Sequence, residues 1–167
     1  MVEMHLSAVR VELPSNTPIL LLQEAEGAHR TLPIYIGPAE AQAIAFAQQG
    51  VDTPRPMTHD LMRDLLEELG ARLECIVITE LRDRTFYAEI RLIASGQRHV
   101  VSARPSDAVA LAVRVSGTIY AEEDLLDAEG VILPGDDGDE TEPPEAEELV
   151  SEFREFIEGI RPEDFES

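Results

Sequence analysis

The stretch PSDAVALAV at residues 105–113 decides the fold, because the chain carries a similar stretch, PAEAQAIAF, at residues 38–46. Each stretch begins with a proline, which is favoured at the first position of a helix. Each proline is followed twelve residues later by a glycine, Gly50 or Gly117, and glycine is a common helix end. The two stretches therefore predict helices over 39–49 and 106–116.

Three strands are expected before each of these helices. Alternating and β-branched residues indicate strands at 2–13, 18–24 and 31–36, and again at 73–81, 85–94 and 98–103. The turn Ala25-Glu26-Gly27 resembles Ala94-Ser95-Gly96, and Glu12-Leu13 resembles Glu80-Leu81. Alanine is common in this chain, so chance similarity is the alternative, but the matched order of turns and helix favours an internal duplication.

Two strand-strand-strand-helix units predict an α+β fold, with a mixed, largely antiparallel sheet and helices packed on it. The units are expected to join side by side. A linking helix is expected from Thr58 to about Leu69, with Thr58 as its N-cap and Gly70 at its end. Its apolar stripe is Leu61, Leu65, Leu66 and Leu69. A short strand is expected at 118–121.

The composition divides the chain near residue 133. Residues 1–133 carry all these patterns and are expected to form one domain. Residues 134–145 are rich in Asp, Glu, Pro and Gly and predict a disordered acidic linker. Residues 146–161 predict an amphipathic helix that docks in cis or on a protein partner, followed by a tail at 162–167. Its apolar face is Leu149, Val150, Phe153, Phe156, Ile157 and Ile160.

The sequence excludes several classes of protein. No window approaches the roughly 20 consecutive apolar residues of a membrane span, and the N-terminus lacks the pattern of a signal peptide. The single cysteine, Cys75, excludes an internal disulfide framework and is expected to be a small buried hydrophobe in a strand. These features predict a cytoplasmic protein without membrane contact.

The net charge of −21 is unevenly distributed. Residues 1–121 hold 11 Arg and 15 acidic residues, whereas residues 122–167 hold 2 Arg and 19 acidic residues. The chain has no lysine, so every basic side chain is an Arg, which binds phosphate or carboxylate in a two-pronged manner. Genome composition alone also explains this preference. Any nucleic acid must therefore bind at a local Arg-lined cleft, because there is no basic stripe.

Three helix starts concentrate the candidate functional residues. Each carries an acid in its first turn: Glu40, Asp60 or Asp107. Arg55 and Arg104 precede the second and third starts, so these starts are candidate anion sites. The structural alternative is that the acids, together with Thr58 and Ser106, only cap their helices, and the arginines pair with nearby acids.

Metal and acid–base candidates are fewer. The four His have no metal-ligand spacing, but His59 and Asp60 are adjacent at one helix start. Asp83, in the turn Arg82-Asp83-Arg84, becomes a candidate metal ligand only if it lies near Asp60 or Asp107.

Residues 36–41 (IGPAEA), 55–61 (RPMTHDL) and 103–112 (ARPSDAVALA) resemble the hallmark blocks of the bifunctional nuclease domain family. The resemblance covers roughly residues 4–132. It implies an α+β fold that tends to form homo-oligomers, and cleavage of both RNA and DNA. It also implies roles for the candidate residues: His59 as general base or acid, and Asp60 and Asp107 as further catalytic residues. Arg55, Thr58, Arg104 and Ser106 would bind the substrate. Asp60, Asp107, Asp83 and Glu40 would bind Mg²⁺ or Mn²⁺ or orient the attacking water.

A second class of function is kept open. The same helix starts could form a non-catalytic, oligomeric module that binds an anion or nucleotide and recruits a partner through residues 146–161. Convergence of the carboxylates would favour the nuclease, whereas carboxylates that are apart and paired with Arg would favour the binding module.

The acidic segment generates the first testable prediction. Residues 136–167 hold 14 acidic residues and 2 Arg, so their removal changes the net charge from −21 to −9. An anionic chain competes with phosphate for the same guanidinium groups over about 8–10 Å at physiological salt. At low ionic strength, protein truncated after residue 135 should bind single-stranded DNA or RNA more tightly than the full chain. The gap should close as salt rises, and equal affinities across the salt series would leave the segment a role in solubility or partner docking.

Overall fold

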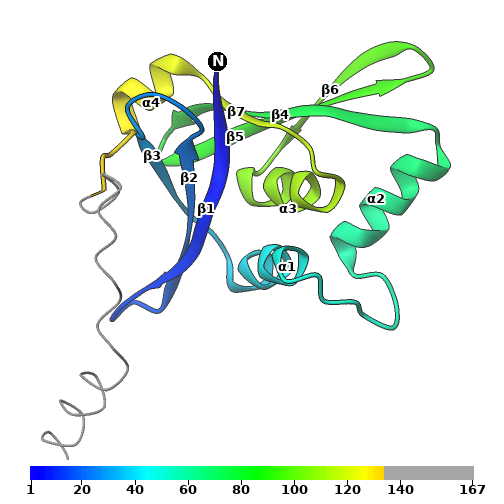
Figure 1. Cartoon of the computed structure of the whole chain (residues 1–167), viewed down its shortest axis with the longest axis horizontal. Coiled ribbons are helices and arrows are strands. Elements are labelled where there is room, and N and C mark those ends of the chain that lie inside the picture. Colours follow the sequence, from blue (N-terminus) through cyan, green and yellow to red (C-terminus); the bar gives the residue numbers. More distant parts are fainter. Residues whose placement is uncertain (134–167) are drawn as a thin grey trace, which may run out of the picture. The chain divides into compact units, whose positions relative to one another are not determined.

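A seven-stranded mixed sheet forms the centre of residues 1–133, the part of the chain that the structure, a computed structural model, describes (Figure 1). The linker expected at 134–145, the helix expected at 146–161 and the tail at 162–167 lie outside the described residues. The α+β fold predicted from the sequence is confirmed.

The two expected strand-strand-strand-helix units are present. The first consists of β1 (Val2–Glu12), β2 (Thr17–Glu24), β3 (Thr31–Tyr35) and α1 (Pro38–Gln48). The second consists of β4 (Ala71–Arg82), β5 (Thr85–Ala94), β6 (Gln97–Ala103) and α3 (Pro105–Val115). Each set of three strands is an antiparallel meander, so consecutive strands are neighbours in the sheet.

The strand registers of both units bring core residues opposite one another. In the first unit Leu20 lies opposite Ile34. In the second unit Ile76 lies opposite Ile90. The repeat in the sequence is thus accompanied by a repeat of the strand-strand-strand-helix order.

A short strand joins the two units. β7 (Ile119–Ala121) lies between β1 and β4, antiparallel to β1 and parallel to β4, in the order β3-β2-β1-β7-β4-β5-β6. The strand expected at 118–121 is present, and the two units join side by side through it. Because β7 intervenes, β1 and β4 run in opposite directions, and the helices that follow the two meanders start near each other.

Helices α1, α3 and α2 (Thr58–Glu68) lie on the same side of the sheet (Figure 1). α3 is the most deeply buried of them, since its residues 108–112 are at most 1% exposed. Four small or β-branched residues in this run let α3 approach both the sheet and α1 closely. Leu111 packs into the same apolar core as Ile76 and Ile78 of β4.

Helix α4 (Glu123–Glu129) is an element that the sequence patterns did not predict. Its seven residues are mostly acidic, but Leu125 and Leu126 are buried in the core. Arg30 holds the helix to the end of β2, because its guanidinium binds Glu24 at 2.6 Å, Glu123 at 2.8 Å and Asp127 at 2.5 Å. Arg30 also lowers the pKa of the Glu24 carboxyl, mainly through this hydrogen bond.

Helix α2 differs from its expected form in two respects. Its N-cap is Met57 rather than Thr58, because the Asp60 carboxylate, not a hydroxyl, accepts the hydrogen bond from the Met57 N–H. The expected apolar stripe is also wrong in part. Leu66 packs against the core, but Leu61, Leu65 and Leu69 are about half exposed or more. The helix contacts α3 and β4 and is not covered on its outer side by residues 1–133.

Two further expectations concern single residues. Ser106 does not cap α3, because Arg104 is the N-cap and Pro105 is the first residue of the helix. Cys75 is 8% exposed in β4, as expected, and burial raises the pKa of its thiol. Across residues 1–133, the structure contains no helix with the length and hydrophobicity needed to cross a membrane.

A matched pair of leucines tests this packing. Leu111→Ala removes a side chain that is 1% exposed, so it should lower the free energy of unfolding by about 2–5 kcal/mol. Leu65→Ala, on the exposed side of α2, should cost well under about 1 kcal/mol. Urea denaturation of both variants measures the difference. Equal losses would mean that Leu65 is covered in solution.

Candidate active site

A cleft of about 330 Å³, here called the helix-start cleft, lies where the first turns of α1, α2 and α3 meet. These turns are far apart in the sequence. They come together because the two units join in opposite directions on either side of β7. The residues that line the cleft come from all three helix starts: Ala39, Glu40, Gln42, Ala43, Met57, Thr58, His59, Arg104 and Asp107. Five of the residues singled out in the sequence are therefore in one place: Glu40, Thr58, His59, Arg104 and Asp107.

A histidine–aspartate pair connects α2 to α3 in this cleft. His59 Nε2 lies 3.1 Å from Asp107 Oδ1. His59 is 7% exposed, and the Asp107 side chain is 25% exposed. An ionised carboxylate only accepts hydrogen bonds, so Nε2 carries the hydrogen and Nδ1 is the nitrogen that remains to accept a proton. The pair therefore has the geometry of an oriented acid–base histidine.

Arg104 joins the two carboxylates that face the cleft. Its Nε and Nη2 donate to Asp107 at 2.7 and 3.1 Å, and Nη2 also lies 2.8 Å from Glu40 Oε1. No partner of Arg104 Nη1 is found in residues 1–133. Because the Arg104 side chain is 66% exposed, this nitrogen can approach an incoming anion while the other two keep their carboxylate contacts.

The charge state of Asp107 is set by opposing effects. Burial raises the pKa of its carboxyl, but hydrogen bonds from Arg104 and His59 outweigh burial and leave the pKa below its ordinary value. Asp107 is therefore ionised at neutral pH and able to hold the His59 ring.

The repeat explains why one arginine serves two acids. Glu40 and Asp107 occupy equivalent positions, the third residue of α1 and of α3, and Gly37 stands where the second unit has Arg104. A Cβ atom at Gly37 would lie only 2.2 Å from Glu40 Oε2. Glycine at position 37 thus leaves room for the Glu40 carboxylate to bend over the start of α1 and meet Arg104.

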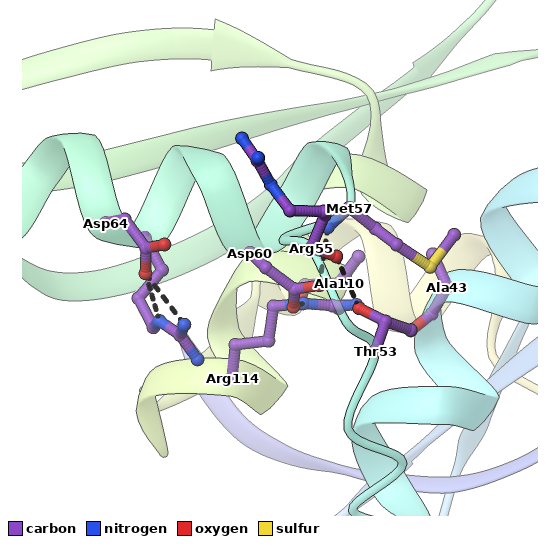
Figure 2. A network of polar contacts seen from close by, with 9 residues as sticks. Ala43, Thr53, Arg55, Met57, Asp60, Asp64, Ala110 and Arg114 are labelled. Atoms are coloured by element: carbon purple, nitrogen blue, oxygen red, sulfur yellow. Dashed lines mark hydrogen bonds and ion pairs between the residues drawn. The ribbon is translucent and has the colours of Figure 1, made fainter.

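Asp60 has a different role from its neighbour His59. Its Oδ1 accepts a 2.5 Å hydrogen bond from Arg114 Nε, and its Oδ2 accepts the Met57 N–H at 2.9 Å (Figure 2). The Arg114 side chain is 4% exposed and also donates to the carbonyl oxygens of Ala110 and Ala43. Both Asp60 oxygens thus accept hydrogen bonds where α1, α2 and α3 meet. Asp60 is not among the residues that line the cleft.

The remaining sequence candidates lie elsewhere. Arg55 is on the loop before α2, and its side chain points away from the Asp60–Arg114 pair (Figure 2). Asp83 is in the β4–β5 turn with a φ of 51° and does not line the cleft. Ser106 is 6% exposed and lines a neighbouring cavity of about 350 Å³, which also contains Arg104.

The carboxylates do not assemble a metal site in this geometry. Within residues 1–133, no three His, Cys, Asp or Glu side chains are grouped so that they could hold a metal ion. Asp60 is bound by Arg114, and Arg104 binds both Asp107 and Glu40. The requirement for Mg²⁺ or Mn²⁺ stays a prediction.

Two residues of this region were missed by the sequence analysis. Gln42 lines the cleft and is the polar residue at the position where the second unit has Val109, so the repeat itself contained that signal. Arg114 looks like an ordinary charged residue near the end of a helix. Its partners lie 54 and 71 residues away, and no local pattern indicates them.

The fold and the cleft define a duplicated α+β domain whose three helix starts present an Asp-oriented His and an Arg. Residues 20–134 match the model of the bifunctional nuclease domain, and the chain belongs to this family. It is 46% identical over 166 residues to an uncharacterized protein of Mycobacterium tuberculosis, an alignment that covers 99% of this chain and 98% of that protein.

Named relatives are more distant. The chain is 24% identical over 124 residues to bifunctional nuclease 2 of Arabidopsis thaliana, covering 71% of this chain and 38% of the plant protein. It is 25% identical over 118 residues to bifunctional nuclease 2 of Oryza sativa subsp. japonica, covering 68% and 36%. Nuclease activity is thus supported for this chain at the level of its family.

The Asp60–Arg114 junction generates a stability prediction with a matched control on the same helix. Asp60→Asn leaves the buried Arg114 charge uncompensated and should lower the free energy of unfolding by about 3 kcal/mol at pH 7. Asp64→Asn removes a partner of Arg63 at the surface and should cost under about 1 kcal/mol.

The pH dependence of the Asp60 effect has a definite sign. The hydrogen bond from Arg114 lowers the pKa of Asp60 in the folded protein, despite partial burial. Its contribution is therefore complete above the unfolded-state pKa, near 4, and is lost as the pH falls through the lower folded-state pKa. The difference between wild type and Asp60→Asn should shrink below about pH 4. A difference that stays constant down to pH 2 would contradict the ion pair.

Proposed function

We propose that this chain is a nuclease that hydrolyses phosphodiester bonds in RNA and DNA at the helix-start cleft. The observation that carries the proposal is the His59–Asp107 hydrogen bond, set beside Arg104 in a cleft open to solvent. Membership of the bifunctional nuclease domain family supports the same reaction class.

His59 is the proton-transfer residue of this proposal. Its Nδ1 removes a proton from water, the resulting hydroxide attacks phosphorus, and the bond to the leaving oxygen breaks as that oxygen takes up a proton from solvent water. The imidazolium then returns its proton to the solvent. Asp107 orients the ring and stabilises the imidazolium that forms, because it is ionised and bound to Nε2. Asp107 is thus a positioning residue for His59.

Arg104 supplies the positive charge for the phosphate. Its Nη1 has no partner in residues 1–133 and can donate to a non-bridging phosphate oxygen, which gains negative charge in the transition state. Glu40 and Asp107 hold the other guanidinium nitrogens, so the arginine is oriented before substrate arrives. Thr58, exposed at the first position of α2, is a further donor at the cleft wall.

A second function has its own supporting observation. Asp60, Asp107 and Glu40 are each paired with an arginine, the arrangement expected for a binding module rather than a metal-dependent active site. The second candidate is therefore a non-catalytic domain that binds an anion or nucleotide in the same cleft.

Substitution of the pair separates the two candidates. His59→Ala and Asp107→Asn should each lower the cleavage rate of single-stranded RNA and DNA by about 100-fold or more, since the first removes the acid–base group and the second removes the carboxylate that orients it. His5→Ala, an exposed histidine on β1, is the matched control and should cleave at the wild-type rate. Circular dichroism should show that all three variants are folded.

Two outcomes would contradict the nuclease. Wild-type cleavage by a purified His59→Ala, Asp107→Asn double variant would indicate a contaminating enzyme. Binding of the oligonucleotide without cleavage, with and without added Mg²⁺ or Mn²⁺, would favour the binding module. Cleavage by wild type that EDTA abolishes would establish the predicted cation requirement.

A further inference from the structure

A second cavity, here called the Arg84 cavity, lies next to the helix-start cleft and has a volume of about 350 Å³. The end of β3 with Gly37 forms one wall, and the start of β5 forms another. The first turn of α3 contributes Arg104 and Ser106. Arg104 lines both hollows, so the Arg84 cavity continues the surface on which the substrate phosphate is proposed to bind.

Arg84 brings an unpaired positive charge to this cavity. It lies in the β4–β5 turn with a φ of 60°, and its exposed guanidinium has no ion pair with any residue of the described chain. The neighbouring Arg82, in contrast, pairs with Glu80 and stacks on the Tyr87 ring, 4.5 Å from its centroid. Arg82 is thus held by residues of its own chain, whereas Arg84 is available to bind an anion.

Ser106 is the second polar feature of the cavity. The residue is 6% exposed and lines the cavity, and no hydrogen bond of its hydroxyl is found within residues 1–133. The hydroxyl is therefore available to bond a ligand group in the cavity. Its place in the first turn of α3 favours an anionic group, because the backbone dipoles of the helix point their positive ends there.

Aromatic surface completes the cavity. Tyr35, at the end of β3, is 59% exposed, and its hydroxyl donates to Glu12 at 3.1 Å, which fixes the ring. Phe86, at the start of β5, is half-buried on the other wall. Exposed aromatic rings beside arginines are the usual arrangement for stacking a nucleobase next to a bound phosphate.

We propose that the Arg84 cavity binds one nucleotide unit, with its phosphate between Arg84 and Ser106 and its base against Tyr35 or Phe86. This inference rests on the proposed function, in which the scissile phosphate lies at Arg104. A single strand would then run from the helix-start cleft across Arg104 into the cavity, and the cavity would hold the nucleotide next to the scissile bond. A base held in the cavity would be unpaired, so the cavity would favour a single-stranded substrate.

The test measures binding of adenosine monophosphate, adenosine and inorganic phosphate to the full-length protein by NMR titration. Adenosine monophosphate should bind, and Arg84→Gln should weaken its binding about tenfold or more, because a charged phosphate contact is lost. Arg82→Gln, on the same turn but already paired, is the matched control and should leave the affinity unchanged. Ser106→Ala should weaken binding of adenosine monophosphate and of inorganic phosphate together.

Tyr35→Ala and Phe86→Leu separate the base from the phosphate. At least one of them should weaken the binding of adenosine monophosphate about fivefold or more without changing the affinity for inorganic phosphate. Equal adenosine monophosphate affinity in wild type and Arg84→Gln would overturn the proposal, as would an equal loss in Arg82→Gln. Tight binding of phosphate with no contribution from the base would reduce the cavity to a simple anion site and would also overturn it.

The same experiments distinguish this proposal from the nuclease proposal. Binding of adenosine monophosphate that depends on Arg84, in a protein without cleavage activity, would support the cavity and contradict the nuclease. Cleavage that depends on His59, with nucleotide binding that is insensitive to Arg84, would do the reverse. If both proposals hold, Arg84→Gln should raise KM for a short oligonucleotide and leave kcat nearly unchanged.

Discussion

The arrangement of the three helix starts depends on one buried guanidinium, that of Arg114. It comes from the last turn of α3 and binds the Asp60 carboxylate of α2 and the Ala43 carbonyl of α1. A charge that is 4% exposed is tolerable only with such partners, so the three helices are held at the distance that satisfies it. Asp60 is adjacent to His59 in the chain. The ion pair that fixes Asp60 therefore also sets where His59 meets Asp107.

Duplication supplies the cleft, and divergence between the copies makes it asymmetric. Two identical units would place two equivalent acids and two equivalent N-cap residues at the meeting point of α1 and α3. Here the acids Glu40 and Asp107 are retained, whereas the N-caps are Gly37 and Arg104. Arg104 therefore pairs with both carboxylates. The third nitrogen of its guanidinium, Nη1, remains available on the solvent side.

The sequence predicts what depends on local pattern and misses what depends on distant partners. The meanders and the alanine-rich helices follow from the repeats, and the candidate residues His59, Arg104 and Asp107 from helix-start chemistry. Whether their helix starts meet was left open, because that depends on how the two units join. The cap of α2 was misassigned, because Thr58 has the right hydroxyl but Asp60 already occupies the Met57 N–H. The pairing of Asp60 with Arg114 could not be predicted, because Arg114 lies 54 residues further along the chain. α4 was missed, since seven mostly acidic residues form a helix only where Leu125 and Leu126 find the core.

The central position of β7 has a consequence for how the protein is made. β1 spans Val2–Glu12, yet one of its two neighbours in the sheet is β7, residues 119–121, which leave the ribosome more than a hundred residues later. Until then the first meander has an open edge, and the second has no strand beside β4 to complete the sheet. Pairings between residues so far apart in the sequence slow folding. The entropy cost of closing the intervening chain comes before the stabilising contacts form. The nascent chain therefore carries two half-sheets with exposed edges. They can join into one sheet only after the three residues of β7 are synthesised, almost at the end of the domain.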